Sequence, residues 1–96
     1  MTKYRLTNEA KEDLLRIYEF GIFAFGSSQA YKYLNSFFDC FELIAKQPLA
    51  FESVDYIKMG YRRCLCGSDS IFYRIENGLV EIVTIIGRQD IEKIIK

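Results

Sequence analysis

The segment Leu79–Ile86 constrains the fold more than any other part of this 96-residue chain. It alternates like a strand but is apolar on both sides, which is typical of a strand that has neighbours and is covered on both faces. Asn77-Gly78 precedes it and favours a type I′ turn, because both central positions of that turn need a positive φ. We therefore predict a hairpin with a strand at 69–76 and a second neighbour, which we infer to be a short strand at 2–6. The predicted faces are Leu79, Val83 and Ile85 on one side and Val80, Ile82 and Ile86 on the other.

A first helix is predicted over residues 8–25, where apolar residues recur at spacings of three and four. Thr7 or Asn8 can cap its start, since a short side-chain oxygen accepts an otherwise unpaired backbone N–H. Gly26 can end it. The acidic residues of its first turns are expected to be exposed charges favoured by the helix dipole. They are Glu9, Glu12 and Asp13.

A second helix follows at once and has its own apolar stripe. Ser27 or Ser28 can cap it, and it should end near Lys46 or Gln47 because Pro48 cannot continue a helix. So short a link makes the two helices fold back as an antiparallel hairpin.

The remaining segments complete an α+β fold. Residues 48–60 are predicted to be a loop, 61–66 a strand joined to the next by a turn at Gly67-Ser68, and 88–96 a short C-terminal helix or tail. The predicted architecture is β-α-α-β-β-β, with a helical hairpin packed on a mainly antiparallel four-stranded sheet. The length fits one domain, residues 1–96.

Composition excludes several kinds of chemistry. The chain has no histidine, the commonest general base and metal ligand. Cys40, Cys64 and Cys66 lack the spacing of a zinc site, and we expect reduced thiols in a cytoplasmic protein. Thirteen basic and 13 acidic residues balance, which argues against direct nucleic-acid binding, and no apolar run is long enough to span a membrane. We predict no catalytic residues, no metal and no cofactor.

The first helix carries apolar side chains outside its core-facing stripe: Leu15, Phe20 and Phe23. One interpretation is that the second helix wraps far enough to cover them. The other is that they form a groove for an apolar peptide or an amphipathic helix.

Basic residues gather in the second half of the chain, where residues 58–96 carry seven basic and five acidic groups. The arginines there form either a solvated face of the sheet or a patch that recognises carboxylates or phosphates. They are Arg62, Arg63, Arg74 and Arg88.

Short motifs also run through the chain in a fixed order. They are Leu6-Thr7, Ala10, Asp13-Leu14, Tyr18, Gly26, Pro48, Gly60-Tyr61-Arg62-Arg63, Gly67-Ser68, Ile71-Phe72-Tyr73-Arg74 and Gly87-Arg88-Gln89-Asp90. With the order of elements, this series resembles the RelE/ParE toxin superfamily of bacterial toxin–antitoxin modules over nearly the whole chain. The C-terminal motifs are most similar to the ParE branch.

The resemblance implies the toxin component of a type II toxin–antitoxin system, neutralised by a ParD-like antitoxin. ParE-like members inhibit DNA gyrase by binding, and RelE-like members are ribosome-dependent mRNA endonucleases. An amphipathic antitoxin tail would cover Leu15, Phe20 and Phe23, the apolar residues outside the core-facing stripe. Its acidic groups would pair with Arg63, Arg74 or Arg88. Candidates for contact with the target are Tyr61, Arg62 and Arg88.

The residues at positions matching the ribonuclease branch favour the ParE branch. Cleavage of RNA needs a group that takes a proton and groups that stabilise phosphate charge. The chain has Cys64, Ser70, Gln89 and Ile95 at these places, and only Arg62 keeps a basic group. We therefore expect a binding toxin and not an enzyme. The alternatives are a RelE-like mRNA endonuclease and a binding module that has lost its toxicity.

Overall fold

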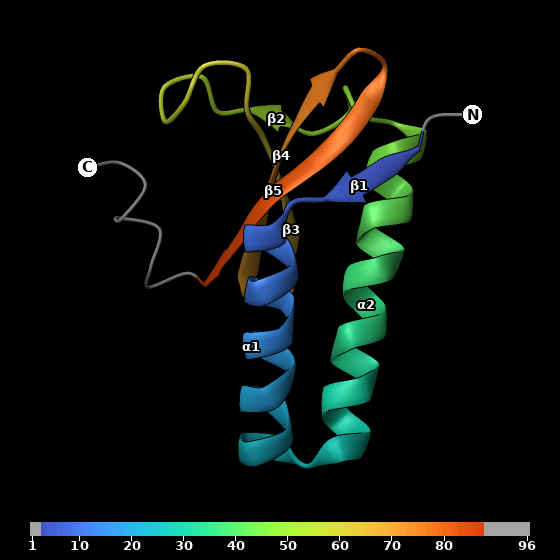
Figure 1. Cartoon of the computed structure of the whole chain (residues 1–96), viewed down its shortest axis with the longest axis vertical. Helices are drawn as coiled ribbons and strands as arrows, with labels where there is room; N and C mark the ends of the chain where they lie inside the picture. The colour runs from blue at the N-terminus through green and yellow to red at the C-terminus, as the bar shows by residue number, and fades with distance from the viewer. Residues whose placement is uncertain (1–2, 88–96) are drawn as a thin grey trace.

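A computed structural model describes residues 3–87 and has two helices packed against a five-stranded sheet (Figure 1). The sheet order is β1-β5-β4-β3-β2, with β1 parallel to β5 and every other pair antiparallel. The α+β class, the helical hairpin and the pairing of the first strand with the last are confirmed. The elements are β1 (Tyr4–Leu6), α1 (Asn8–Phe25), α2 (Ser27–Lys46), β2 (Glu52–Ser53), β3 (Arg62–Cys66), β4 (Asp69–Glu76) and β5 (Leu79–Gly87).

The sheet has one strand more than predicted. Glu52 and Ser53 lie in the segment predicted as a loop, and they pair with Arg63 and Arg62 as β2. A strand of two residues is too short to show the alternation from which strands are predicted. The helix or tail predicted at 88–96 lies outside the described residues.

β5 contains a β-bulge, which makes the predicted division of its side chains wrong. The register with β4 shifts at Val83, which has no partner across the ladder. A bulge adds one residue and so reverses the alternation beyond it. Val80, Ile82 and Ile85 therefore all belong to the core, whereas strict alternation had grouped Ile86, and not Ile85, with the first two.

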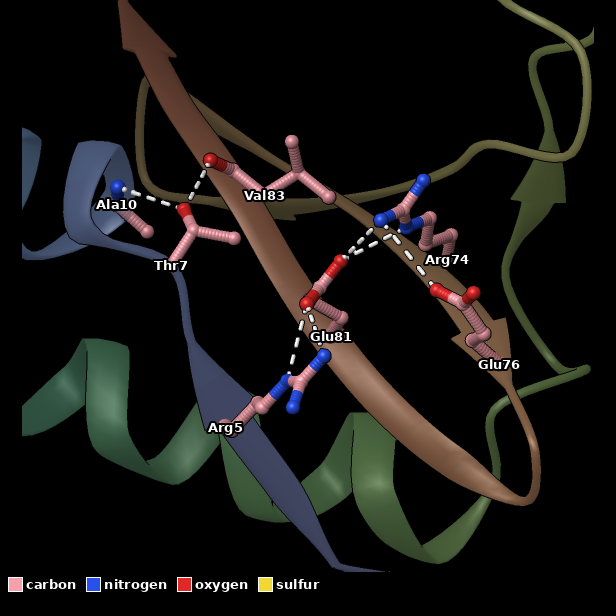
Figure 2. A network of polar contacts seen from close by, with 7 residues as sticks. All are labelled: Arg5, Thr7, Ala10, Arg74, Glu76, Glu81 and Val83. Carbon is pink, nitrogen blue, oxygen red and sulfur yellow. Dashed lines mark hydrogen bonds and ion pairs between the residues drawn. The ribbon is translucent and has the colours of Figure 1, made fainter.

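The two helices begin differently. Thr7 caps α1 as predicted, because its Oγ1 accepts from the Ala10 N–H at 3.0 Å and donates to the Val83 carbonyl at 2.7 Å (Figure 2). The predicted serine cap of α2 is wrong. Gly26 takes that place with a φ of 89°, no side chain caps the helix, and Ser27 is already helical. Turning the chain at one residue needs this positive φ, which favours glycine.

Asp13 is a buried anchor and not the exposed charge predicted for it. It is 7% exposed, and its Oδ2 accepts from the Ile85 N–H at 3.0 Å and from Thr84 Oγ1 at 2.7 Å. β5 is paired with β1 only over Val80–Ile82. Beyond Ile82, where the pairing with β1 has ended, the Asp13 carboxylate therefore accepts hydrogen bonds from β5.

The core lies between the helical hairpin and the sheet. The helices approach closely at Gly21, where an added Cβ would lie 3.2 Å from the Cβ of Ala30. Within residues 3–87, neither helix is both long and apolar enough to cross a membrane. The buried core residues are Ala10, Leu14, Phe37, Phe41, Ile44, Cys64, Cys66, Ile71, Tyr73, Val80, Ile82 and Ile85.

Candidate protein-binding surfaces

The end of the helical hairpin projects beyond the strands (Figure 1). Side chains near this turn have no sheet to pack on, so large apolar residues remain exposed there. Phe20 is 64% exposed, Phe23 is 90% exposed and Phe25 is 71% exposed. Leu15, further from the turn, is 57% exposed. α2 therefore does not cover the apolar residues that the sequence places outside the core stripe.

A shallow cleft of about 260 Å³ runs between the two helices. Its walls are apolar or aromatic except for Lys11, the one charged residue among the six that line it. Such a cleft suits an apolar side chain of a partner, followed by an acidic group that can reach the lysine. The lining residues are Lys11, Leu14, Leu15, Tyr18, Leu34 and Phe38.

The three predicted apolar candidates do not form one surface. Leu15 lines the cleft, and Phe20 and Phe23 do not. With 3.6 residues per turn, Phe20 lies about 140° and Phe23 about 80° around the helix from Leu15. A partner that contacts all three must bend around α1 towards the hairpin turn.

Glu81 is the centre of an ion-pair network on the sheet (Figure 2). Its Oε2 accepts from Arg5 Nη2 at 2.7 Å, and its Oε1 accepts from Arg74 Nε at 2.8 Å. Arg74 also lies 3.3 Å from Glu76. Hydrogen bonds from Arg5 and then from Arg74 lower the pKa of Glu81 below its usual 4.5. Arg74 thus already has two internal partners, although 43% of its side chain is exposed.

The other described candidates on the sheet are also engaged within the chain. Arg63 Nε donates to Glu52 at 2.9 Å, and Arg62 Nη1 donates to the Phe51 carbonyl at 2.6 Å. Tyr61 is half-buried, with the Lys58 ammonium 5.3 Å from its ring centre. Arg88 lies outside the described residues. An acidic partner would have to share these arginines with their present acceptors.

Three free thiols gather where α2 crosses β3. Cys40 lies beside Cys64 and Cys66, and Ser36 Oγ is 3.5 Å from the Cys66 sulfur. Burial raises the pKa of all three thiols, that of Cys66 to about 12. Such thiols are poor nucleophiles and poor metal ligands at neutral pH, because both roles need the thiolate. Residues 3–87 contain no group of three Cys, His, Asp or Glu side chains placed to hold a metal.

Several residues of these surfaces were not predicted from the sequence. Tyr18, Leu34 and Phe38 line the cleft, although the sequence predicts no role at the surface for them. Spacings of three and four from other apolar residues predict a helical core stripe and do not distinguish it from the lining of a surface cleft. Arg5 and Glu81 carry no such signal, because their contact depends on the pairing of β1 with β5.

Comparison with known proteins agrees with this architecture. Residues 4–92 match the family model described as the ParE toxin of the type II toxin–antitoxin system parDE. Toxin ParE1 of Caulobacter vibrioides is 35% identical over 86 residues, which cover 90% of this chain and 88% of that protein. Toxin ParE1 of Mycobacterium tuberculosis is 28% identical over 94 residues, 96% of each chain.

Two solved structures share the fold. A chain of the chromosomal ParDE system from P. aeruginosa matches with a TM-score of 0.79 at 18% identity, covering 91% of this chain and 95% of that one. A chain of the RelBE2 toxin–antitoxin complex from M. tuberculosis matches with a TM-score of 0.64 at 17% identity, covering 91% and 98%. The chain therefore belongs to the ParE toxin family of type II toxin–antitoxin systems.

Proposed function

We propose that this toxin acts by binding DNA gyrase, without chemistry of its own, and that a ParD-like antitoxin silences it. Family membership supports the roles of toxin and antitoxin partner. The mode of action is inferred from the burial and the hydrogen bonds of the residues at the positions that match the ribonuclease branch. Cys64 and Ser70 are each 3% exposed, and the guanidinium of Arg62 is bound to a backbone carbonyl. Gln89 and Ile95 lie outside the described residues.

This arrangement supports binding over RNA cleavage for a physical reason. A group that takes the proton of a ribose hydroxyl must reach the RNA, and so must a donor that stabilises the phosphate. Burial prevents this for Cys64, and it also raises the pKa of that thiol. The chain keeps many exposed apolar side chains, which suit protein contacts.

The antitoxin is proposed to bind along the outer side of the helical hairpin. An amphipathic tail would place one apolar side chain in the cleft beside Leu15 and an acidic residue near Lys11. It would then bend around α1 to cover Phe20 and Phe23. Each large apolar side chain that becomes buried contributes roughly 1.5–3 kcal/mol. Arg63, Arg74 and Arg88 are proposed as secondary contacts for further acidic groups.

Calorimetry with the protein encoded beside this toxin tests the antitoxin surface. Leu15→Ser should weaken binding at least tenfold, because the cleft loses an apolar wall. Leu65→Ser is the matched control, since Leu65 is a 63% exposed leucine on β3. Phe20→Ala with Phe23→Ala should weaken binding further. Equal affinities for the wild type and the hairpin variants would reject this surface.

A DNA supercoiling assay tests the target. The purified toxin should block gyrase, and adding the antitoxin should restore supercoiling. Full gyrase activity at excess toxin would reject the proposal. The second candidate, a ribosome-dependent mRNA endonuclease, shares its fold with the RelBE2 structure. It predicts cleaved transcripts by primer extension, with loss of cleavage in Arg62→Ala or Arg88→Ala.

A further inference from the structure

The sheet has a second face, which lies opposite the helical hairpin. Successive side chains of a strand point to opposite faces, and Ile71 and Tyr73 of β4 belong to the core under the helices. Phe72, which lies between them in the sequence, therefore points to the second face, and so does Ser70. In the described part of the chain, α1 and α2 both pack on the core face, so any cover of Phe72 has to come from another segment.

Phe72 is fully buried although it points away from the helices. It is 0% exposed, and Ser70 on the same face is 3% exposed. Its partners across the two ladders are Arg63 on β3 and Thr84 on β5. Neighbours on adjacent strands cover the sides of such a ring, but its outer end stays in water unless another segment lies above it. The complete burial of Phe72 therefore indicates a further layer over this part of the second face.

The layer is confined to β4 and β5. Leu65 on β3 pairs with Ser70 and so points to the same face, yet it is 63% exposed. On the other side of Ser70, its partner Ile86 on β5 is half-buried. A cover that reaches β5 and β4 but leaves β3 exposed favours a short segment that comes from the β5 side of the sheet.

Residues 88–96 are the segment that follows β5. Gly87, the last residue of β5, pairs with Asp69, so the chain leaves the sheet three residues along β4 from Phe72, which is about 10 Å. Nine residues can cover that distance even as a helix, at about 1.5 Å per residue. Three isoleucines recur in this segment at spacings of three and four, while its other six positions are charged or amide residues. Such a pattern is typical of a segment with one apolar side. The isoleucines are Ile91, Ile94 and Ile95.

We propose that residues 88–96 lie across the second face of the sheet over β4 and β5, with their isoleucines packed against Phe72. This inference goes beyond the proposed function and does not depend on the identity of the target. The segment closes the part of the sheet that contains Ser70, one of the positions that match the ribonuclease branch. A ligand of this face, whether RNA or protein, would have to displace the chain's own segment first.

Nuclear magnetic resonance of the full chain with labelled isoleucine methyl groups tests the contact directly. At least one methyl group of Ile91, Ile94 or Ile95 should show a nuclear Overhauser contact with the ring protons of Phe72. Phe72→Leu should shift the signal of that methyl group, because the nearby ring is removed. Phe23→Leu is the control and should leave the signal unchanged, since Phe23 is 90% exposed on α1. Absence of the contact for all three isoleucines would overturn the proposal.

Urea denaturation tests whether the segment stabilises the fold. Ile91→Ser with Ile94→Ser should raise the equilibrium constant of unfolding at least tenfold, because Phe72 loses its apolar cover. Glu92→Ser with Lys93→Ser changes two residues between these isoleucines and should leave the constant within twofold of the wild type. Equal constants for the isoleucine variant and the wild type would also overturn the proposal.

Discussion

The junction between α1 and β5 and the outer side of the helical hairpin distribute polar and apolar groups in opposite ways. Asp13 at the junction, and Glu81 on β5 between β1 and β4, are buried with full sets of hydrogen-bond donors. In the described part of the chain, no buried side-chain nitrogen or oxygen lacks a partner. On the hairpin, aromatic side chains such as Phe23 lie in water. The polar groups are buried and paired within the fold, and the apolar side chains of the hairpin remain exposed.

Residue type alone therefore does not tell whether a side chain is buried: here carboxylates are buried and phenylalanines are exposed. A buried carboxylate with good donors is costly to remove, because the donors then lose their acceptor in a site without water. An exposed phenylalanine contributes little to folding until a partner covers it. Four predictions test this contrast, in order of decreasing effect on stability.

Asp13→Ala should destabilise the protein by roughly 3 kcal/mol, because the buried Ile85 N–H and the Thr84 hydroxyl lose their shared acceptor. Urea denaturation followed by circular dichroism measures the change. Glu12→Ala is the control, since Glu12 is exposed on the same turn and should change stability by less than about 0.5 kcal/mol. Equal losses of stability for the two variants would show that the buried Asp13 carboxylate stabilises the fold no more than an exposed carboxylate does.

Glu81→Gln should cost about 1–2 kcal/mol, because Arg5 and Arg74 lose the charge between them. The pKa of Glu81 is lowered in the folded state, so its contribution is present above pH 4.5 and is lost as the pH falls through the folded value. The variant should therefore show a flatter decline in the free energy of unfolding in acid. Glu76→Gln, which alters an exposed pair, should leave that decline as in the wild type.

Near pH 9, alkali should produce a smaller loss of stability, which then grows gradually as the pH rises. Burial raises the pKa of Cys66 from 9.0 to about 12, so the folded protein keeps a proton that the unfolded chain releases. This stabilisation is complete below pH 9 and declines as the pH rises towards 12. At pH 9, iodoacetamide should label the native thiols at least tenfold more slowly than the urea-unfolded chain. Comparable labelling rates would contradict the burial of the cluster.

Phe23→Ser should change the free energy of unfolding by less than about 0.5 kcal/mol, because the side chain is 90% exposed. The same variant should bind the antitoxin more weakly in calorimetry. A stability loss above 1 kcal/mol would mean that the ring packs within the toxin. The claim that the exposed apolar side chains of the hairpin contribute little to folding would then be wrong for Phe23.

Local signals in the sequence were enough to predict most of the fold. Gly26 separates the two helices from each other, and Pro48 lies just beyond the end of α2. Asn77 and Gly78 adopt φ values of 53° and 75°, as the predicted type I′ turn requires. The two apolar sides of β5 correctly indicated a second neighbour, which is β1.

The errors arose where tertiary contacts override local pattern. The bulge at Val83 depends on the register between β4 and β5, and the burial of Asp13 depends on where β1 stops pairing with β5. Among the candidate sites, Leu15, Phe20 and Phe23 were recognised because they break the helical stripe. Their separation into two surfaces follows from the cleft, which needs both helices in place.

The placement of β5 between β1 and β4 has a consequence for how the toxin is made. β1 is the first strand to leave the ribosome and β5 is the last of the described strands, so the sheet stays divided until synthesis has passed residue 87. Folding that depends on such distant contacts is slow compared with folding through local ones. A nascent chain therefore cannot complete its sheet before β5 inserts, and until then β1 and β4 each lack the neighbour that β5 provides.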